Sequence, residues 1–238
     1  MHHVTLDRWS RLASPLHALD ARVKILAALA IVVSLVLPPH PSPWLLTAYL
    51  GMLTALAALA RLPMLAWFWR AAWVLPFAAG VAALNFFGAD PGRGAFVLAK
   101  SYLSACCLLW LLGTTSLHAL LRGLESLGAP RFLLMVAQFL YRYLFVLSEQ
   151  AQHMRQARRC RAGSGRRQPL FRAATGSLAV LFARSYARAE RIHQAMLARG
   201  FQGHFVLRTP PVLGARDYAF LATVSAALAA LQLALWKP

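Results

Sequence analysis

Residues 25–60 read ILAALAIVVSLVLPPHPSPWLLTAYLGMLTALAALA, a stretch without a single Asp, Glu, Lys or Arg. A helix needs about 20 mostly apolar residues to cross a bilayer, so this stretch is long enough for two crossings. Its middle, the proline-rich run from Pro38 to Pro43, cannot remain helical, because proline lacks the amide donor and clashes with the preceding turn. The stretch therefore predicts two membrane spans, from about Val23 to Leu37 and from Trp44 to Ala60.

Three further uncharged runs predict three more spans: Ala71–Ala89, Ser101–Leu121 and Tyr218–Trp236. The composition of the whole chain agrees, since 59% of its residues are hydrophobic and 13% are charged, against about 25% charged in a soluble domain. We expect an all-α integral membrane protein with about five transmembrane helices. Because the first span is short for a bilayer, a four-span arrangement stays open.

The basic residues are unevenly distributed along the chain. Of its 25 Lys and Arg residues, 16 are arginines between Arg122 and Asp217, where only four acids occur. Cytoplasmic loops of membrane proteins carry such an excess, so this region and the N-terminus are expected on the cytoplasmic side. Three regions follow: residues 1–121 with the N-terminal segment and four transmembrane helices, residues 122–217 as a long cytoplasmic helical segment, and residues 218–238 with the fifth helix and the C-terminus.

The cytoplasmic segment has helical periodicity. Between Arg131 and about Arg161, apolar side chains recur every three or four residues, which predicts one amphipathic helix or two in series. Glycine and proline in residues 162–169 predict a loop, and a second helix is expected from about Leu170 to Arg199. On that second helix, three arginines form a basic stripe, either a binding face or an ordinary solvated or lipid-headgroup face. The stripe consists of Arg184, Arg188 and Arg191.

Arg199 differs from the stripe because Gly200 follows it. Glycine commonly ends a helix in the left-handed conformation, and the negative end of the helix dipole favours a cation in the last turn. A guanidinium held beyond the helix end can make a bidentate contact with a carboxylate of a partner, which lysine cannot copy. The plain alternative is an ordinary helix end with a solvated arginine.

Three segments carry a resemblance to a known family: SPLHALDARVK at residues 14–24, RYLFVLSE at residues 142–149 and AMLARGFQG at residues 195–203. The chain resembles the transmembrane T component of energy-coupling factor transporters, modular ABC-type importers of vitamins and transition-metal ions. It is most similar to the cobalt-type CbiQ branch, over nearly its whole length. The resemblance implies two coupling helices, each ending in an X-Arg-X motif whose arginine docks into one subunit of an ATPase pair.

The second of these motifs carries over directly as Ala198-Arg199-Gly200. For the first motif, the resemblance points to Cys160-Arg161-Ala162, although the family commonly has Ala-Arg-Gly and the glycine here comes one place later, at Gly163. Arg158 and Arg159 are therefore displaced alternatives for the first motif arginine. Together with the basic stripe, they would form a supporting basic face.

The resemblance also implies partners: two ABC-type ATPase subunits and a separate membrane S component that captures the solute, in the cytoplasmic (inner) membrane of a bacterium. Cobalt is favoured as solute, nickel is close behind, and a vitamin remains open. No P-loop (Gly-Lys-Ser or Gly-Lys-Thr) occurs in the sequence, so the chain is not expected to be an enzyme, and ATP and Mg²⁺ belong on the partner ATPases. No directly bound cofactor, metal site or nucleic-acid partner is expected.

Two readings from other classes stay open. An intramembrane enzyme would use the hydroxyl and imidazole groups of the fourth predicted span, although no acidic residue there could orient a base. Those groups belong to Ser101, Ser104, Thr114, Thr115, Ser116 and His118. A basic membrane scaffold for nucleic acid or anionic lipid would instead use the net charge of +18. The three cysteines, at positions 106, 107 and 160, are expected to be packing residues.

Overall fold

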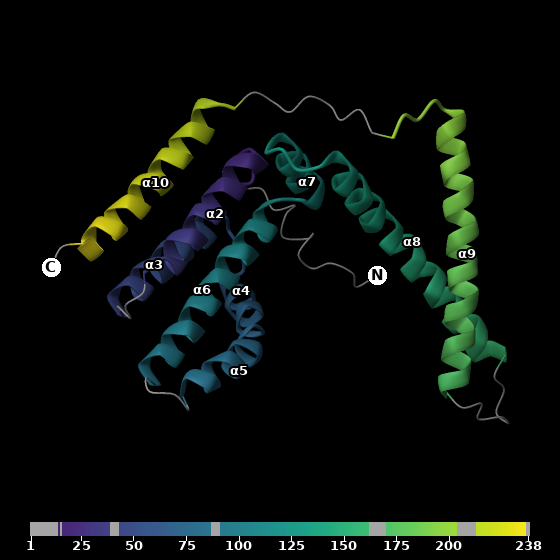
Figure 1. Ribbon diagram of the computed structural model, residues 1–238, viewed down its shortest axis with the longest axis horizontal. Coiled ribbons are helices and arrows are strands. Elements are labelled where there is room, and N and C mark those ends of the chain that lie inside the picture. The colour runs from purple at the N-terminus through teal and green to yellow at the C-terminus, as the bar shows by residue number, and fades with distance from the viewer. Residues whose placement is uncertain are drawn as a thin grey trace. The chain divides into compact units, whose positions relative to one another are not determined.

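The structure is a computed structural model that describes residue 14 and residues 16–38, 43–86, 91–161, 170–203 and 213–236. Within these residues every regular element is a helix (Figure 1), so the protein is all-α, as the sequence predicts. Its contacts divide the chain into two compact units. Residues 1–127 and 209–238 form the first, called here the membrane unit, and residues 128–208 form the second, called the coupling unit after the role that the resemblance implies.

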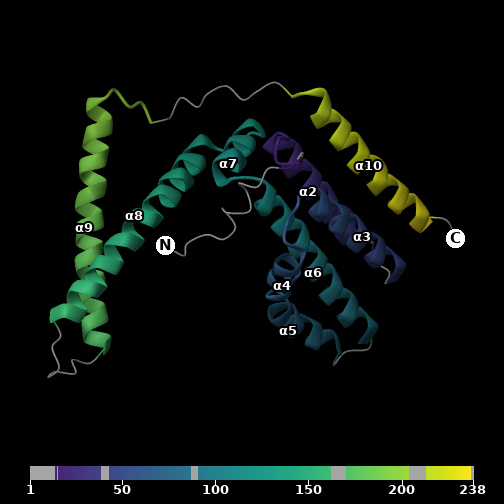
Figure 2. The same cartoon turned by 180° about the vertical axis from the view of Figure 1, so that it is seen from behind.

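The membrane unit contains seven described helices, and three of them coincide with predicted spans. The helices are α2 (Ala21–Val36), α3 (Pro43–Leu59), α4 (Met64–Ala72), α5 (Leu75–Phe86), α6 (Pro91–Thr114), α7 (Leu117–Ser126) and α10 (Ala215–Trp236). The first, second and fifth predicted spans appear as α2, α3 and α10, with α2 ending just before the proline-rich run. In both views α2, α6 and α10 run alongside one another (Figures 1 and 2).

The third predicted span is shifted. The apolar segment long enough to cross a membrane runs from Met64 to Ala83 through α4 and α5, so it begins before Ala71, whereas the predicted end at Ala89 lies outside the described residues. The prediction was wrong because it required an uncharged run, and Arg70 lies inside the helical segment. A single charge near one end does not stop a helix from continuing.

The fourth predicted span is shifted in the same direction. The apolar segment is Gly94–Thr114 within α6, not Ser101–Leu121, and it includes Lys100. The Lys100 amine donates to the carbonyl oxygens of Val36 at 2.9 Å and Pro38 at 2.8 Å, which satisfies the charge and lets the helix extend past it. At the other end, the Ser116 hydroxyl accepts from the Ala119 N–H and starts the separate helix α7.

The core of the membrane unit lies between α2, α3, α4 and α6, with α10 packed on it. Its largest fully buried side chains include Trp67, Trp110 and Tyr49. Cys106 and Cys107 are buried and carry free thiols, which confirms their prediction as packing residues. For Cys160 the same prediction was wrong, because its side chain is exposed. Trp110 stacks on Phe220 of α10 with ring centroids 6.3 Å apart.

The coupling unit consists of two long helices, α8 (Arg131–Arg161) and α9 (Leu170–Ala198). Because α8 is continuous, the alternative of two helices in series is wrong. The predicted loop at residues 162–169 lies outside the described residues, as do residues 204–212 between α9 and α10. The helix predicted from Arg131 to about Arg161 is confirmed with its bounds, and its segment Arg131–Cys160 is also long and apolar enough to cross a membrane.

Candidate functional site

The C-terminal end of α9 is closed by a Schellman motif. Gly200 has a φ of 77°, and its N–H donates to the Leu197 carbonyl at 2.9 Å, while the Phe201 N–H donates to the Met196 carbonyl at 3.1 Å. This is the pair of hydrogen bonds that defines the motif. The sequence prediction that Gly200 ends the helix in the left-handed conformation is therefore confirmed.

The cap fixes the position of Arg199. It follows Ala198, the last residue of α9, and both are exposed. Within the described part of the chain, no ion pair or hydrogen bond joins the Arg199 guanidinium to another side chain. The helix end thus presents a cation outward, where the carbonyl ends of the helix dipole favour a positive charge.

The end of α8 carries the first predicted arginine motif. The helix extends through Arg161, with Cys160 exposed and free. Ala162 and Gly163, which complete the predicted first motif, lie outside the described residues, as does the placement of the Arg161 side chain. Arg158 and Arg159 lie within one turn before Arg161; Arg158 is half-buried and Arg159 is exposed. The choice of Arg161 among the three arginines remains a prediction.

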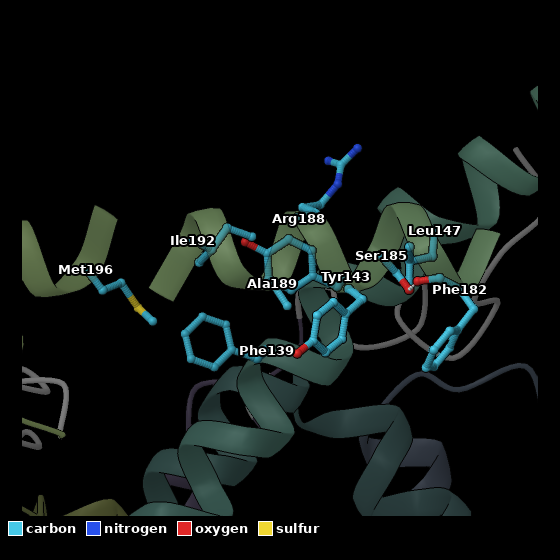
Figure 3. A pocket seen from close by; sticks show the side chains of 10 residues that line it. Phe139, Tyr143, Leu147, Phe182, Ser185, Arg188, Ala189, Ile192 and Met196 are labelled. Carbon is cyan, nitrogen blue, oxygen red and sulfur yellow. Dashed lines mark hydrogen bonds between the residues drawn. The ribbon is translucent and has the colours of Figure 1, made fainter. Parts of the chain in front are cut away.

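A mainly apolar pocket of about 410 Å³ lies between α8 and α9, within the coupling unit (Figure 3). Its wall on α8 is formed by Phe139, Tyr143 and Leu147, and its wall on α9 by Phe182, Ser185, Tyr186, Arg188, Ala189, Ile192 and Met196. The apolar period of α8 is predicted by the sequence, whereas the pocket was not predicted. The three- and four-residue spacing on α9 from position 182 to 196 was the available signal.

The basic stripe of α9 does not act as one surface. Arg188 lies at the pocket and its guanidinium donates to Oε1 of Gln150 on α8 at 3.5 Å, joining the two helices. Arg184 and Arg191 are exposed, and Arg191 Nε donates to the Ala187 carbonyl of its own helix at 3.2 Å. Of the three arginines, Arg188 therefore contacts α8, whereas Arg184 and Arg191 are exposed.

These features define a class of protein: an all-α, multi-pass membrane protein with a pair of long, arginine-rich helices. Across the ranges described by the structure, no group of three or more His, Cys, Asp or Glu residues could hold a metal ion. The family model described as "Cobalt transport protein", CbiQ, matches residues 13–210. The chain therefore belongs to the CbiQ family.

Individual relatives agree with this assignment. The chain is similar to cobalt transport protein CbiQ of Rhodobacter capsulatus, with 32% identity over 206 residues that cover 81% of this chain and 83% of that protein. It is also similar to the nickel permease LarQ of Lactiplantibacillus plantarum, 32% identical over 45% of this chain and 39% of that protein. A protein of Methanocorpusculum labreanum described as a fused cobalt transport protein CbiMQ is 26% identical over 48% of this chain and 19% of that protein.

Proposed function

We propose that this protein is the T component of an energy-coupling factor importer, which couples ATP hydrolysis by two partner ABC-type ATPases to solute uptake through a separate substrate-binding membrane subunit. One observation carries the proposal: Arg199 is presented, exposed, at the Schellman-capped end of the 29-residue helix α9. A rigid helix that ends in an outward guanidinium is suited to transmit displacement through a bidentate contact with a carboxylate.

The sidedness of the coupling unit supports this role. The C-terminal end of α6 and the N-terminal end of α10 meet at α2, because Lys24 donates to the Thr114 carbonyl and the Asp20 N–H donates to Asp217. The chain between Thr114 and α10 must therefore cross the bilayer an even number of times.

The same argument applies to α8, which is long and apolar enough to cross a membrane by itself. It could cross only if α9 crossed back, and α9 is not among the candidate spans found in the described residues. Helix α9 carries Arg184, Arg188, Glu190 and Arg191, and such charges are costly in a bilayer. We therefore place both coupling helices on one side, and the excess of arginine makes that side cytoplasmic.

Cobalt is the first solute to test and nickel the second. The family model and the Rhodobacter relative are named for cobalt transport, and LarQ is named for nickel. The fused CbiMQ protein carries this type of chain joined to another segment, which fits a membrane partner that supplies the solute site. A vitamin-type S component is the remaining alternative.

An intramembrane enzyme gains no support from the placement of its candidate residues. Ser116 caps α7, and the Thr114 hydroxyl donates to the carbonyls of Trp110 and Leu111 in its own helix. The Ser116 hydroxyl therefore caps a helix, and the Thr114 hydroxyl bonds to the backbone of its own helix.

The test is an affinity purification of the chain from its native membrane in mild detergent, with identification of co-purifying proteins and ATPase assay of the eluate. Arg199→Ala is compared with Arg155→Ala, an exposed arginine of α8 outside both motifs. The proposal predicts that P-loop ATPases and a small membrane protein co-purify with the wild type and with Arg155→Ala, and are depleted with Arg199→Ala. Recovery of the wild-type chain alone, from membranes that contain those ATPases, would overturn it.

A further inference from the structure

We infer that α10 is clamped to α2 at two points, by Asp217 at its beginning and by Gln232 near its end, so that the two helices move as one body. The clamp is formed by contacts within the membrane unit, and it does not depend on the proposed function.

The first point is built on one carboxylate. Asp217 Oδ2 accepts the Gly214 N–H at 2.9 Å, and Oδ1 accepts the Asp20 N–H at 3.0 Å. Asp20 is itself the N-cap of α2, where its side chain accepts the Arg22 N–H at 3.0 Å. The first N–H groups of a helix have no acceptor inside the helix. Asp217 accepts from one such group at the start of α10, the Gly214 N–H, and from another at the start of α2, the Asp20 N–H.

A buried lysine joins α6 to the same point. Lys24 is 1% exposed, and its amine donates to the carbonyls of Thr114 at 3.0 Å and His17 at 3.2 Å. Its charge interacts electrostatically with the carboxylates of Asp20 and Asp217. A buried ammonium is tolerated only where it is paired and hydrogen-bonded, and here the two carboxylates and two carbonyls come from separate parts of the chain.

The second point lies near the other ends of the same helices. Gln232 Nε2 donates to the Ser34 carbonyl at 3.0 Å and to its hydroxyl at 2.9 Å. The Ser34 hydroxyl is also hydrogen-bonded to the Tyr49 hydroxyl of α3 at 2.6 Å. Ser34 is 7% exposed, so an amide withdrawn from this group would leave the Ser34 carbonyl without this donor, although the Ser34 and Tyr49 hydroxyls would still bond to each other.

The two points are in register. Asp20 and Ser34 are about 21 Å apart along one helix axis, and Asp217 and Gln232 about 22 Å along the other, at 1.5 Å per residue. Both helices begin at the first point, so they run parallel. A slide of α10 by a single turn, about 5.4 Å, would break both contacts together. Between them, Val224 and Leu228 of α10 are buried in the core.

The clamp has a mechanical consequence. Residues 199–214 connect α9 to α10 in the chain. The clamp holds the start of α10 against α2, so this end of the connection cannot move independently of α2. This consequence rests on the proposed function, whereas the clamp itself can be tested on the full-length chain alone.

The test measures spin-label distances between α2 and α10 in the full-length chain in lipid nanodiscs, in a Cys160→Ser background that leaves only the two buried cysteines. Labels replace exposed residues: Leu26 with Tyr218 near the first point, and Val33 with Leu233 near the second. Each pair is measured in the unsubstituted background, in Asp217→Asn, in Gln232→Leu and in the double variant. The control is Thr223→Ala, whose hydroxyl only donates within α10.

The clamp predicts one narrow distance for each pair in the background and the control. Each single variant should broaden the nearer pair more than the farther one, because one point still holds the register, and the double variant should broaden both. A broad or two-peaked distribution in the background would overturn the inference, and so would single variants as narrow as the control. If the double variant does not fold, the single variants alone decide.

Discussion

Gly123 of α7 lies directly against Ile25 of α2. A Cβ atom at position 123 would come 2.9 Å from Ile25 Cδ1, 3.2 Å from Ala21 Cβ and 3.3 Å from the Arg22 backbone nitrogen. The Ile25 side chain can move aside, but the backbone of α2 cannot do so without shifting the helix. Helix α7, which follows the last apolar helix before the coupling unit, is therefore held on α2 by close backbone approach.

Replacement of Gly123 by valine should therefore destabilise the membrane unit. We expect a loss of about 1 to 3 kcal/mol, the usual cost of overpacking, seen as a lower midpoint in thermal unfolding followed by tryptophan fluorescence in detergent. The matched control is Gly51→Val in α3, where an added Cβ meets nothing within 4 Å. Equal midpoints for the two variants would contradict the close contact between α7 and α2.

The cap of α9 can be tested separately from its arginine. In Gly200→Ala, the left-handed φ of 77° is strained by about 1 to 2 kcal/mol for a residue with a Cβ, so the last turn should fray and Arg199 should lose its fixed direction. Binding to the proposed partner ATPases should weaken although the arginine is present. Gly176→Ala is the control, since Gly176 lies within α9 in open space and alanine favours helix there.

The Arg199 contact, as proposed, should depend on the guanidinium fork rather than on charge alone. Truncation of one partner of a buried charge pair costs about 2 to 5 kcal/mol, which corresponds to a roughly 30-fold to several-thousand-fold weaker affinity. Arg199→Ala should show this loss, and Arg199→Lys should recover only a minor part of it. The measurement is the dissociation constant of the detergent-solubilised chain for the ATPase pair, and full recovery by lysine would exclude a bidentate contact.

Much of the fold could be predicted because its signals are local. The prolines from Pro38 onward end α2, and Gly200 ends α9, since each acts on the backbone within one turn. The periodicity of residues 131–161 gave the bounds of α8 for the same reason. After Arg161 the glycine comes one place later than in the family pattern, so the local signal is weaker there, and Arg161 stays the predicted motif arginine with Arg158 and Arg159 as alternatives.

The span boundaries failed where the deciding contact is distant in sequence. Lys100 was excluded from the fourth span because an isolated charge is costly in a membrane. Its partners are the carbonyls of Val36 and Pro38, which no local pattern connects to it. The contact between Arg188 and Gln150 across the coupling helices was missed in the same way, since a stripe of arginines indicates a polar face but not which member meets a neighbouring helix.

Lys24 and Lys100 both donate to backbone carbonyls. Replacement of Lys24 should lower the stability of the protein more, because Lys24 is more deeply buried. Lys24 is 1% exposed and interacts electrostatically with the Asp20 and Asp217 carboxylates, whereas the two contacts of Lys100 are exposed or partly buried. Lys24→Met would leave the Thr114 and His17 carbonyls without their donor, and each hydrogen bond from a charged group contributes about 1.5 to 3 kcal/mol.

For Lys100→Met the expected loss is about 1 kcal/mol, the typical net contribution of a hydrogen bond. Urea unfolding in detergent, followed by tryptophan fluorescence, should therefore rank Lys24→Met far below Lys100→Met in stability. Asp217→Asn should cost less stability in Lys24→Met than in the wild-type chain, because the electrostatic interaction between Asp217 and Lys24 is already lost there. Additive losses in that double variant would show that Lys24 acts only through its carbonyl contacts and not through the charge of Asp217.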